Sequence, residues 1–177
     1  MGMRHPRLYA LLLTFLTACN STDYRHALEL RVSEDEPGDA GNAFGESDGA
    51  GVAYTVYRRD TDEGLPIGFE LGIGQQSDGA THGELNHAWM GAFREFGESV
   101  VRPFVGVGVI NTELVRGAGA DAGEFGPYAQ VGLRVYLTPA YHMAIGYRES
   151  FGIEDTVDGQ DYDLTTIQVF FSLGFGF

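Results

Sequence analysis

The residues of this 177-residue chain that could do chemistry are charged side chains set within runs of alternating apolar residues. They are Glu29, Arg31, Arg59, Glu70, Glu84, Arg94, Arg134 and Arg148. Successive side chains of an extended chain point to opposite faces, so these charges share the polar faces of such runs. Charges on an enclosed face need partners, and arginine can bond to several acceptors at once. We therefore expect an ion-pair and hydrogen-bond network, with a gated pore or a ligand site as alternatives.

Nucleophilic catalysis would need a histidine, a serine and an acid within hydrogen-bond reach of one another. His142 and Ser150 share a face of one extended run, but eight residues of strand separate them by about 26 Å. His82 with Ser150, near one end of the expected sheet, is the pairing that remains. We predict that the chain is not an enzyme, and a lipid A-modifying enzyme at that end is the alternative.

An acidic segment near the carboxyl end could bind a cation. It spaces Asp155, Asp158, Asp161 and Asp163 around Gly159. Oxygen ligands on a glycine-containing loop suit calcium, but the spacing departs from the EF-hand and lacks its closing glutamate. We interpret the segment as a solvated acidic loop, and we predict no metal site and no cofactor.

The charge of the whole chain excludes one class of partner. Asp and Glu number 25 against 11 Lys and Arg, which gives a formal net charge of −14. Nucleic acid is bound largely through its phosphates by basic surfaces, so we predict no nucleic-acid binding.

The elements that must position these side chains are eight runs in which apolar residues alternate with polar or small ones. They are residues 26–32, 51–59, 67–75, 82–96, 102–111, 127–137, 140–150 and 166–177. Such alternation is typical of β-strands. Long and short connections mostly alternate along the chain, as in an up-and-down sheet, and no run predicts an amphipathic helix.

The composition of the polar faces indicates which side of the sheet meets water. In residues 104–110 and 166–176 the second face carries no charge, which suits a narrow barrel interior better than a solvated surface. Acidic residues gather instead in the long connections 33–50 and 151–163. We therefore predict an all-β fold, an eight-stranded antiparallel up-and-down transmembrane β-barrel whose apolar face meets lipid. The alternative is a soluble, lipid-anchored, lipocalin-like barrel, with its apolar face inside.

Residues 82–96 fit this scheme with one exception. Leu85, Trp89 and Phe93 form the apolar face of the run, with His87 interrupting it, and Glu84 and Arg94 lie on the other face. We therefore expect Trp89 and Phe93, like Tyr141 and Phe175, to be lipid-facing or interface aromatics. Glu84 and Arg94 are then expected in the lumen with Glu70, Arg134 and Arg148.

The amino end has the form of a targeting segment. Arg4, His5 and Arg7 precede the apolar run 8–16, which is too short to span a bilayer as a helix. The run ends in Leu16-Thr17-Ala18-Cys19, which resembles the lipobox of bacterial lipoproteins. The resemblance implies a signal peptide over residues 1–18, lipidation of Cys19, and a barrel domain over residues 19–177.

The carboxyl half resembles the small eight-stranded outer-membrane barrels of the OmpA, OmpX and opacity-protein type. The resemblance rests on alternation from residue 102 to the terminal phenylalanine, and it implies that Phe171, Phe175 and Phe177 form the family's assembly signal. Barrel-assembly machinery, outer-membrane lipid and lipopolysaccharide are then the expected partners of a monomer in the bacterial outer membrane. A lipobox departs from the family's usual signal peptide. The expected role is non-enzymatic, in envelope structure or surface interaction.

Overall fold

The computed structural model describes residues 24–37, 47–58, 67–77, 83–116, 122–157 and 160–177. The predicted signal peptide, Cys19, Arg59, His82 and Asp158 lie outside these residues. Among the described residues, no helix is long and apolar enough to cross a bilayer.

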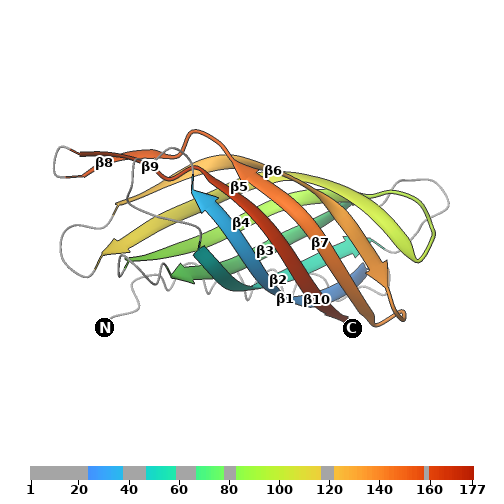
Figure 1. Cartoon of the computed structure of the whole chain (residues 1–177). Coiled ribbons are helices and arrows are strands. Elements are labelled where there is room, and N and C mark those ends of the chain that lie inside the picture. The colour runs from blue at the N-terminus through green and yellow to red at the C-terminus, as the bar shows by residue number, and fades with distance from the viewer. Residues whose placement is uncertain (1–23, 38–46, 59–66, 78–82, 117–121, 158–159) are drawn as a thin grey trace.

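Eight antiparallel strands form a closed barrel (Figure 1). They are β1 (Tyr24–Pro37), β2 (Ser47–Arg58), β3 (Ile67–Ser77), β4 (Gly83–Glu95), β5 (Val101–Arg116), β6 (Ala122–Tyr136), β7 (Tyr141–Ser150) and β10 (Thr166–Gly176). Each strand neighbours the barrel strands before and after it in sequence, and β1 pairs with β10 to close the ring. The predicted eight-stranded, antiparallel, up-and-down barrel is therefore confirmed.

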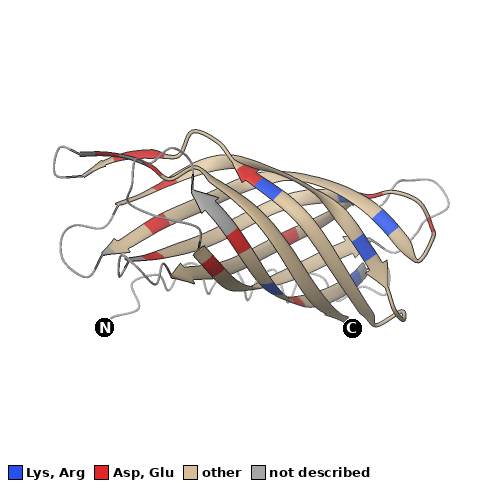
Figure 2. Ribbon diagram, in the orientation of Figure 1, with Lys and Arg blue, Asp and Glu red and all other residues tan. Residues whose placement is uncertain are grey.

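A small hairpin lies outside the barrel, in a connection where the sequence predicted only a loop. Its strands are β8 (Glu154–Val157) and β9 (Gln160–Asp163), which form a separate two-stranded sheet. Acidic residues gather at the end of the barrel that carries this hairpin (Figure 2). We call this the loop end, and the opposite end, where β1 begins and β10 finishes, the terminal end.

The seam between the first and last strands is complete. Leu28 pairs with Phe175 and Leu30 with Leu173, and the register continues from Ala27 to Pro37. A sheet closed in this way leaves no row of unpaired backbone groups, which is the requirement for strands placed in lipid.

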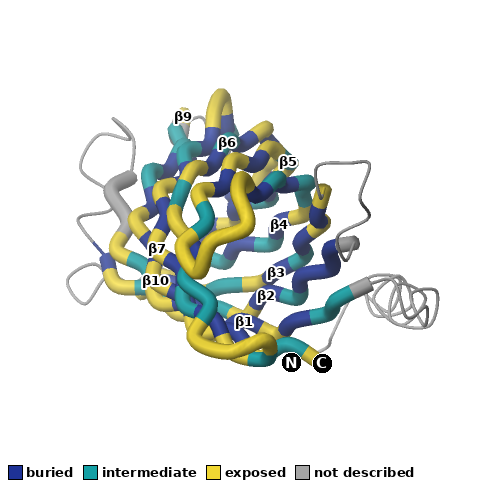
Figure 3. Tube along the Cα trace, turned by 90° about the vertical axis from the view of Figure 1, so that its right-hand side faces the viewer, coloured by how far each residue is buried: buried dark blue, intermediate teal, exposed yellow. Residues whose placement is uncertain are grey.

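Each of the eight barrel strands exposes at least one large apolar side chain on the outer face, although on β4 Met90 is the one that does so. Leu30 on β1, Val107 on β5 and Ile145 on β7 are 61%, 64% and 55% exposed, although each lies in the middle of its strand. Along most of the barrel strands, buried residues alternate with exposed or intermediate ones (Figure 3). The lipocalin-like alternative predicted the opposite arrangement, with the apolar face inside, and is wrong on this point.

On β4 the predicted faces are reversed. Trp89 and Phe93 are buried inside the barrel, whereas Glu84 is exposed on the outer face. The cause is the neighbouring strand, because Gly72 pairs with Trp89 and Gly68 with Phe93. A Cβ at Gly72 would lie 2.2 Å from the Trp89 ring, and one at Gly68 would lie 2.3 Å from the Phe93 ring. The glycines of β3 therefore leave the space inside the lumen that the aromatic rings of β4 fill.

Candidate functional site

The lumen is filled by buried charged side chains, and Glu29 on β1 is at their centre. Arg31 Nη2 donates hydrogen bonds to Glu29 Oε2 at 3.1 Å and to Glu70 Oε2 at 2.7 Å. Arg134 Nη2, from β6, donates to Glu29 Oε1 at 2.8 Å. Strands β3 and β6 are thereby joined through the interior to β1, which carries Glu29 and Arg31.

The network continues to both ends of the lumen. Toward the terminal end, Arg134 Nη1 donates to Glu95, whose other oxygen lies 3.8 Å from Arg102. Toward the loop end, Arg148 Nη2 donates to Glu70 Oε1 at 3.1 Å. The side chains of Tyr128 and Gln130 also donate to Glu70 Oε1, at 2.7 and 2.8 Å.

These contacts form a row of alternating charges that we call the ion-pair chain. In order from the terminal end it runs Arg102, Glu95, Arg134, Glu29, Arg31, Glu70, Arg148. Each carboxylate therefore lies between two guanidinium groups. This arrangement supplies the several partners that a buried charge requires, and it occupies the interior of a barrel that is only wide enough to hold side chains.

Aromatic rings pack around the guanidinium groups of the ion-pair chain. The Arg148 guanidinium carbon lies 4.5 Å from the centre of the Trp89 ring and 4.7 Å from that of Tyr128. The Arg134 guanidinium lies 5.0 Å from the Phe93 ring. Cations over ring faces at these distances are stabilised, so the inward aromatic residues of β4 bind the arginines as well as filling space.

Eight charged residues were predicted for the lumen from sequence alternation, and the structure brings five of them together. The ion-pair chain contains Glu29, Arg31, Glu70, Arg134 and Arg148. Glu84 does not, because it is exposed on the outer face and accepts a hydrogen bond from Gln75 Nε2 at 2.8 Å. Arg94 also lies on the outer side of β4, with its guanidinium 5.3 Å from the Phe96 ring. For these two residues the prediction is wrong, because Trp89 and Phe93 occupy the inward positions of their strand.

Glu95 and its partner Arg102 are the two members of the ion-pair chain that sequence reasoning missed. For Glu95 the cause is the assignment of faces on β4. Glu95 shares the inward face of β4 with Trp89 and Phe93, so an outward assignment of those rings also moved Glu95 out of the lumen. The glycines at positions 68 and 72 were the available signal, since small residues on one strand leave room for large ones on the next.

The serine and histidine side chains considered for catalysis do not lie together in the structure. Ser150 accepts a hydrogen bond from the backbone N–H of Thr166 at 2.7 Å, near the loop end. His142 Nε2 lies 3.1 Å from Glu29 Oε1, on the terminal side, and His87 Nδ1 lies 3.2 Å from the Thr112 hydroxyl. His82 lies outside the described residues.

The carboxylates of the acidic hairpin bind protein groups in the described part of the chain. Asp155 Oδ2 accepts from the Gly123 backbone N–H at 2.8 Å, and Asp161 Oδ1 accepts from the Thr156 hydroxyl at 2.6 Å. Across residues 24–177, leaving aside the stretches without described placement, no cluster of three or more His, Cys, Asp or Glu could hold a metal ion.

The predicted assembly signal lies on the outer surface at the terminal end. Phe171, Phe175 and Phe177 are all exposed. The backbone N–H of Phe177 donates to the His26 carbonyl at 2.9 Å, and its ring stacks on that of Phe175 with 6.3 Å between centroids. The backbone of the last residue is thus bound to β1, while its side chain remains open to contact.

Comparison with known proteins shows the fold. No family model matches the chain, and no curated protein sequence matches it. The crystal structure of Neisserial surface protein A (NspA) is 13% identical, with a TM-score of 0.62 over 88% of this chain and 98% of that one. The N-terminal β-barrel domain of Pseudomonas aeruginosa OprF is 15% identical, with a TM-score of 0.56 over 85% and 97%. Ail, the attachment invasion locus protein of Yersinia pestis, is 12% identical, with a TM-score of 0.56 over 87% and 97%. The chain therefore has the fold of the small outer-membrane β-barrel proteins.

Proposed function

We propose that the chain is a non-enzymatic integral protein of the bacterial outer membrane that acts in envelope structure or surface interaction. The observation that carries this proposal is the apolar outer face, which is exposed on every barrel strand. Exposed apolar surface of this extent needs a cover, and lipid covers the whole circumference of a closed barrel without a protein partner.

The height of the apolar outer face agrees with a bilayer. On β5 the outward apolar residues run from Val101 to Val109, and on β10 they run from Ile167 to Phe175. Nine residues of strand extend about 27 Å, which at a tilt of about 40° covers roughly 20 Å of bilayer, close to the ~25 Å usual for such proteins. Toward the loop end this face gives way to acids, including Glu34, Asp48 and Glu113, which suit an aqueous boundary.

The filled lumen favours a surface role over transport. The ion-pair chain and the inward rings of Trp89, Phe93 and Phe170 occupy the interior, so no wide aqueous path is expected. The acidic loop end then becomes the part of the molecule available to other surfaces, including lipopolysaccharide. The names of two structural neighbours, Neisserial surface protein A and the attachment invasion locus protein Ail, are consistent with such a role.

The proposal includes a lipid anchor at Cys19. β1 begins at Tyr24, only five residues after Cys19, and it begins at the terminal end, away from the acidic loops. An anchor at that position would enter the leaflet on the terminal side of the barrel, which in the proposed orientation faces the periplasm. The monomer would then be held by lipid at the anchor and by its own strands.

Labelled palmitate and membrane fractionation test the anchor and the location together. We expect the native chain to take up label and to fractionate with the outer membrane. Cys19→Ala should lose the label, because Cys19 is the only cysteine, yet stay in the outer membrane, because the strands themselves insert. Absence of label on the native chain would contradict the anchor, and release of Cys19→Ala into the periplasm would contradict the membrane-spanning barrel.

A further inference from the structure

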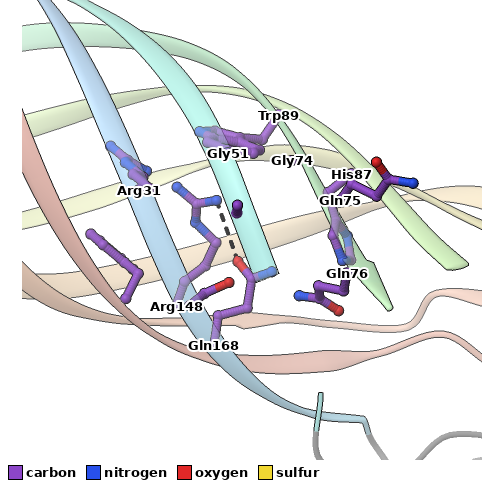
Figure 4. A pocket seen from close by; sticks show the side chains of 12 residues that line it. Arg31, Gly51, Gly74, Gln75, Gln76, His87, Trp89, Arg148 and Gln168 are labelled. Carbon is purple, nitrogen blue, oxygen red and sulfur yellow. Dashed lines mark hydrogen bonds between the residues drawn. The ribbon is translucent and has the colours of Figure 1, made fainter. Parts of the chain in front are cut away.

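A small cavity lies in the lumen at the loop-end side of the ion-pair chain. Its volume is about 20 Å³, and residues from six strands line it (Figure 4). Arg31, Gln76, Trp89, Arg148 and Gln168 are among them. A cavity of this size holds about one particle as large as a water molecule.

Several hydrogen-bonding atoms around this cavity have no partner within the described part of the chain. The Gln76 side chain is 2% exposed, and neither its Nε2 nor its Oε1 has a partner there. The same holds for Arg31 Nη1. A buried polar group without a partner is costly, so the donors among these atoms, Gln76 Nε2 and Arg31 Nη1, indicate an occupant that accepts hydrogen bonds. Gln76 Oε1 is itself an acceptor and needs a separate donor.

The charges around the cavity determine which kind of occupant fits. Two arginines line it, Arg31 and Arg148, and no Asp or Glu does. The carboxylate that both of these arginines bind, Glu70, already accepts from Arg31 at one oxygen and from Tyr128, Gln130 and Arg148 at the other. A cation would therefore meet two positive charges with no carboxylate to bind it, whereas an anion would meet charged donors.

We propose that this cavity is a binding site for one small monovalent anion of halide size. The Arg31 guanidinium and the Gln76 amide N–H would donate to it. Phosphate and organic anions are too large for the space. The anion would continue the alternation of the ion-pair chain by one further negative charge, and it would bind the folded barrel only, so it should also stabilise the fold.

The chain carries its own reporter for this site, because Trp89 is its only tryptophan and lines the cavity. The experiment uses the full mature chain refolded in detergent and titrated with sodium bromide, with sodium gluconate holding the ionic strength constant. We expect a saturable change in Trp89 fluorescence that chloride competes away. A linear change without saturation, or no competition by chloride, would overturn the proposal and indicate a cavity filled with water.

Two matched variants connect the signal to the cavity. Gln76→Leu removes the buried amide. Gln75→Leu makes the same change at the adjacent residue, which also borders the cavity but whose exposed amide donates to Glu84 on the outer face. We expect bromide affinity to fall about tenfold in Gln76→Leu and to stay unchanged in Gln75→Leu. Equal affinity in the two variants would overturn the assignment.

The fold of each variant is verified by its mobility on an unheated gel before titration. If Gln76→Leu does not fold, the test uses the urea unfolding of the native chain. The midpoint of its urea unfolding should then rise with bromide and not with gluconate. An equal response to both salts would contradict a specific site.

Discussion

At the scale of single residues, the interior depends on carboxylates that each have two arginine partners. Glu29 illustrates the arrangement, because it accepts from Arg31 and Arg134 and also lies beside His142, Thr55 and Ser172. Taking such charges out of water is unfavourable, and only a full set of partners offsets that cost. A single change that removes the negative charge of Glu29 therefore leaves two buried guanidinium groups, those of Arg31 and Arg134, without one of the carboxylates that offsets their burial.

Glu29→Gln should destabilise the barrel strongly. We expect the free energy of unfolding to fall by about 3–5 kcal/mol, the usual cost of breaking a buried ion pair on one side. Urea unfolding in lipid vesicles, followed by Trp89 fluorescence, measures it. The matched control is Glu34→Gln on the same strand, an exposed position where the change should be within about 0.5 kcal/mol. Equal stabilities of the two variants would contradict a structural role for the ion-pair chain.

Alternation along the sequence was sufficient to predict some lumen residues and insufficient for others. For β3, β6 and β7 one face is clearly apolar, so Glu70, Arg134 and Arg148 fall inside. On β4 one face is aromatic and the other mixes charges with alanine and methionine, and aromatic residues suit both a lipid interface and a packed lumen. The deciding fact is the pairing of Gly68 and Gly72 with those rings, which requires the register between β3 and β4.

At the scale of elements, the strand count followed from alternation, whereas the β8–β9 hairpin did not. The hairpin has two strands of four residues, too short for alternation to identify. The dipeptide Asp158-Gly159 between them is a known hairpin-turn sequence and was the available signal. Short elements of this kind depend on contacts such as that of Asp155 with Gly123, which are not visible in sequence.

The last strand provides a prediction about assembly. Phe177 is 67% exposed, and its contact with β1 is made by the backbone, which a smaller side chain leaves in place. Phe177→Ala should therefore reduce the amount of folded barrel in cells several-fold and leave the urea midpoint of the refolded protein nearly unchanged. Phe151→Ala, an exposed phenylalanine at the loop end, is the control. Normal cellular assembly of Phe177→Ala would contradict the role of the terminus as an assembly signal.

At the scale of the whole molecule, the barrel is apolar outside and polar inside, the reverse of a water-soluble barrel. Its strands are all paired, and its interior is tied together by the ion-pair chain. Such a structure has no free edge at which detergent could begin to separate the strands.

Resistance to detergent should follow from this closure. We expect the refolded chain to migrate on an SDS gel at one position without heating and at another after boiling, because the unheated barrel stays compact. A single position under both conditions would show that no detergent-resistant barrel forms. The Glu29→Gln variant should lose the unheated position at a lower temperature than the native chain.

The central claim, that lipid covers the outer face while Trp89 lies in the lumen, is tested most directly by brominated lipids. Bromine on the acyl chains quenches indole fluorescence at short range. Two proteins are compared in vesicles: the native chain, and a Trp89→Phe, Leu30→Trp variant whose indole lies on the outer face of β1 between Val52 and Leu173. We predict strong quenching at position 30 and weak quenching of Trp89. Stronger quenching of Trp89 than of position 30 would contradict the account.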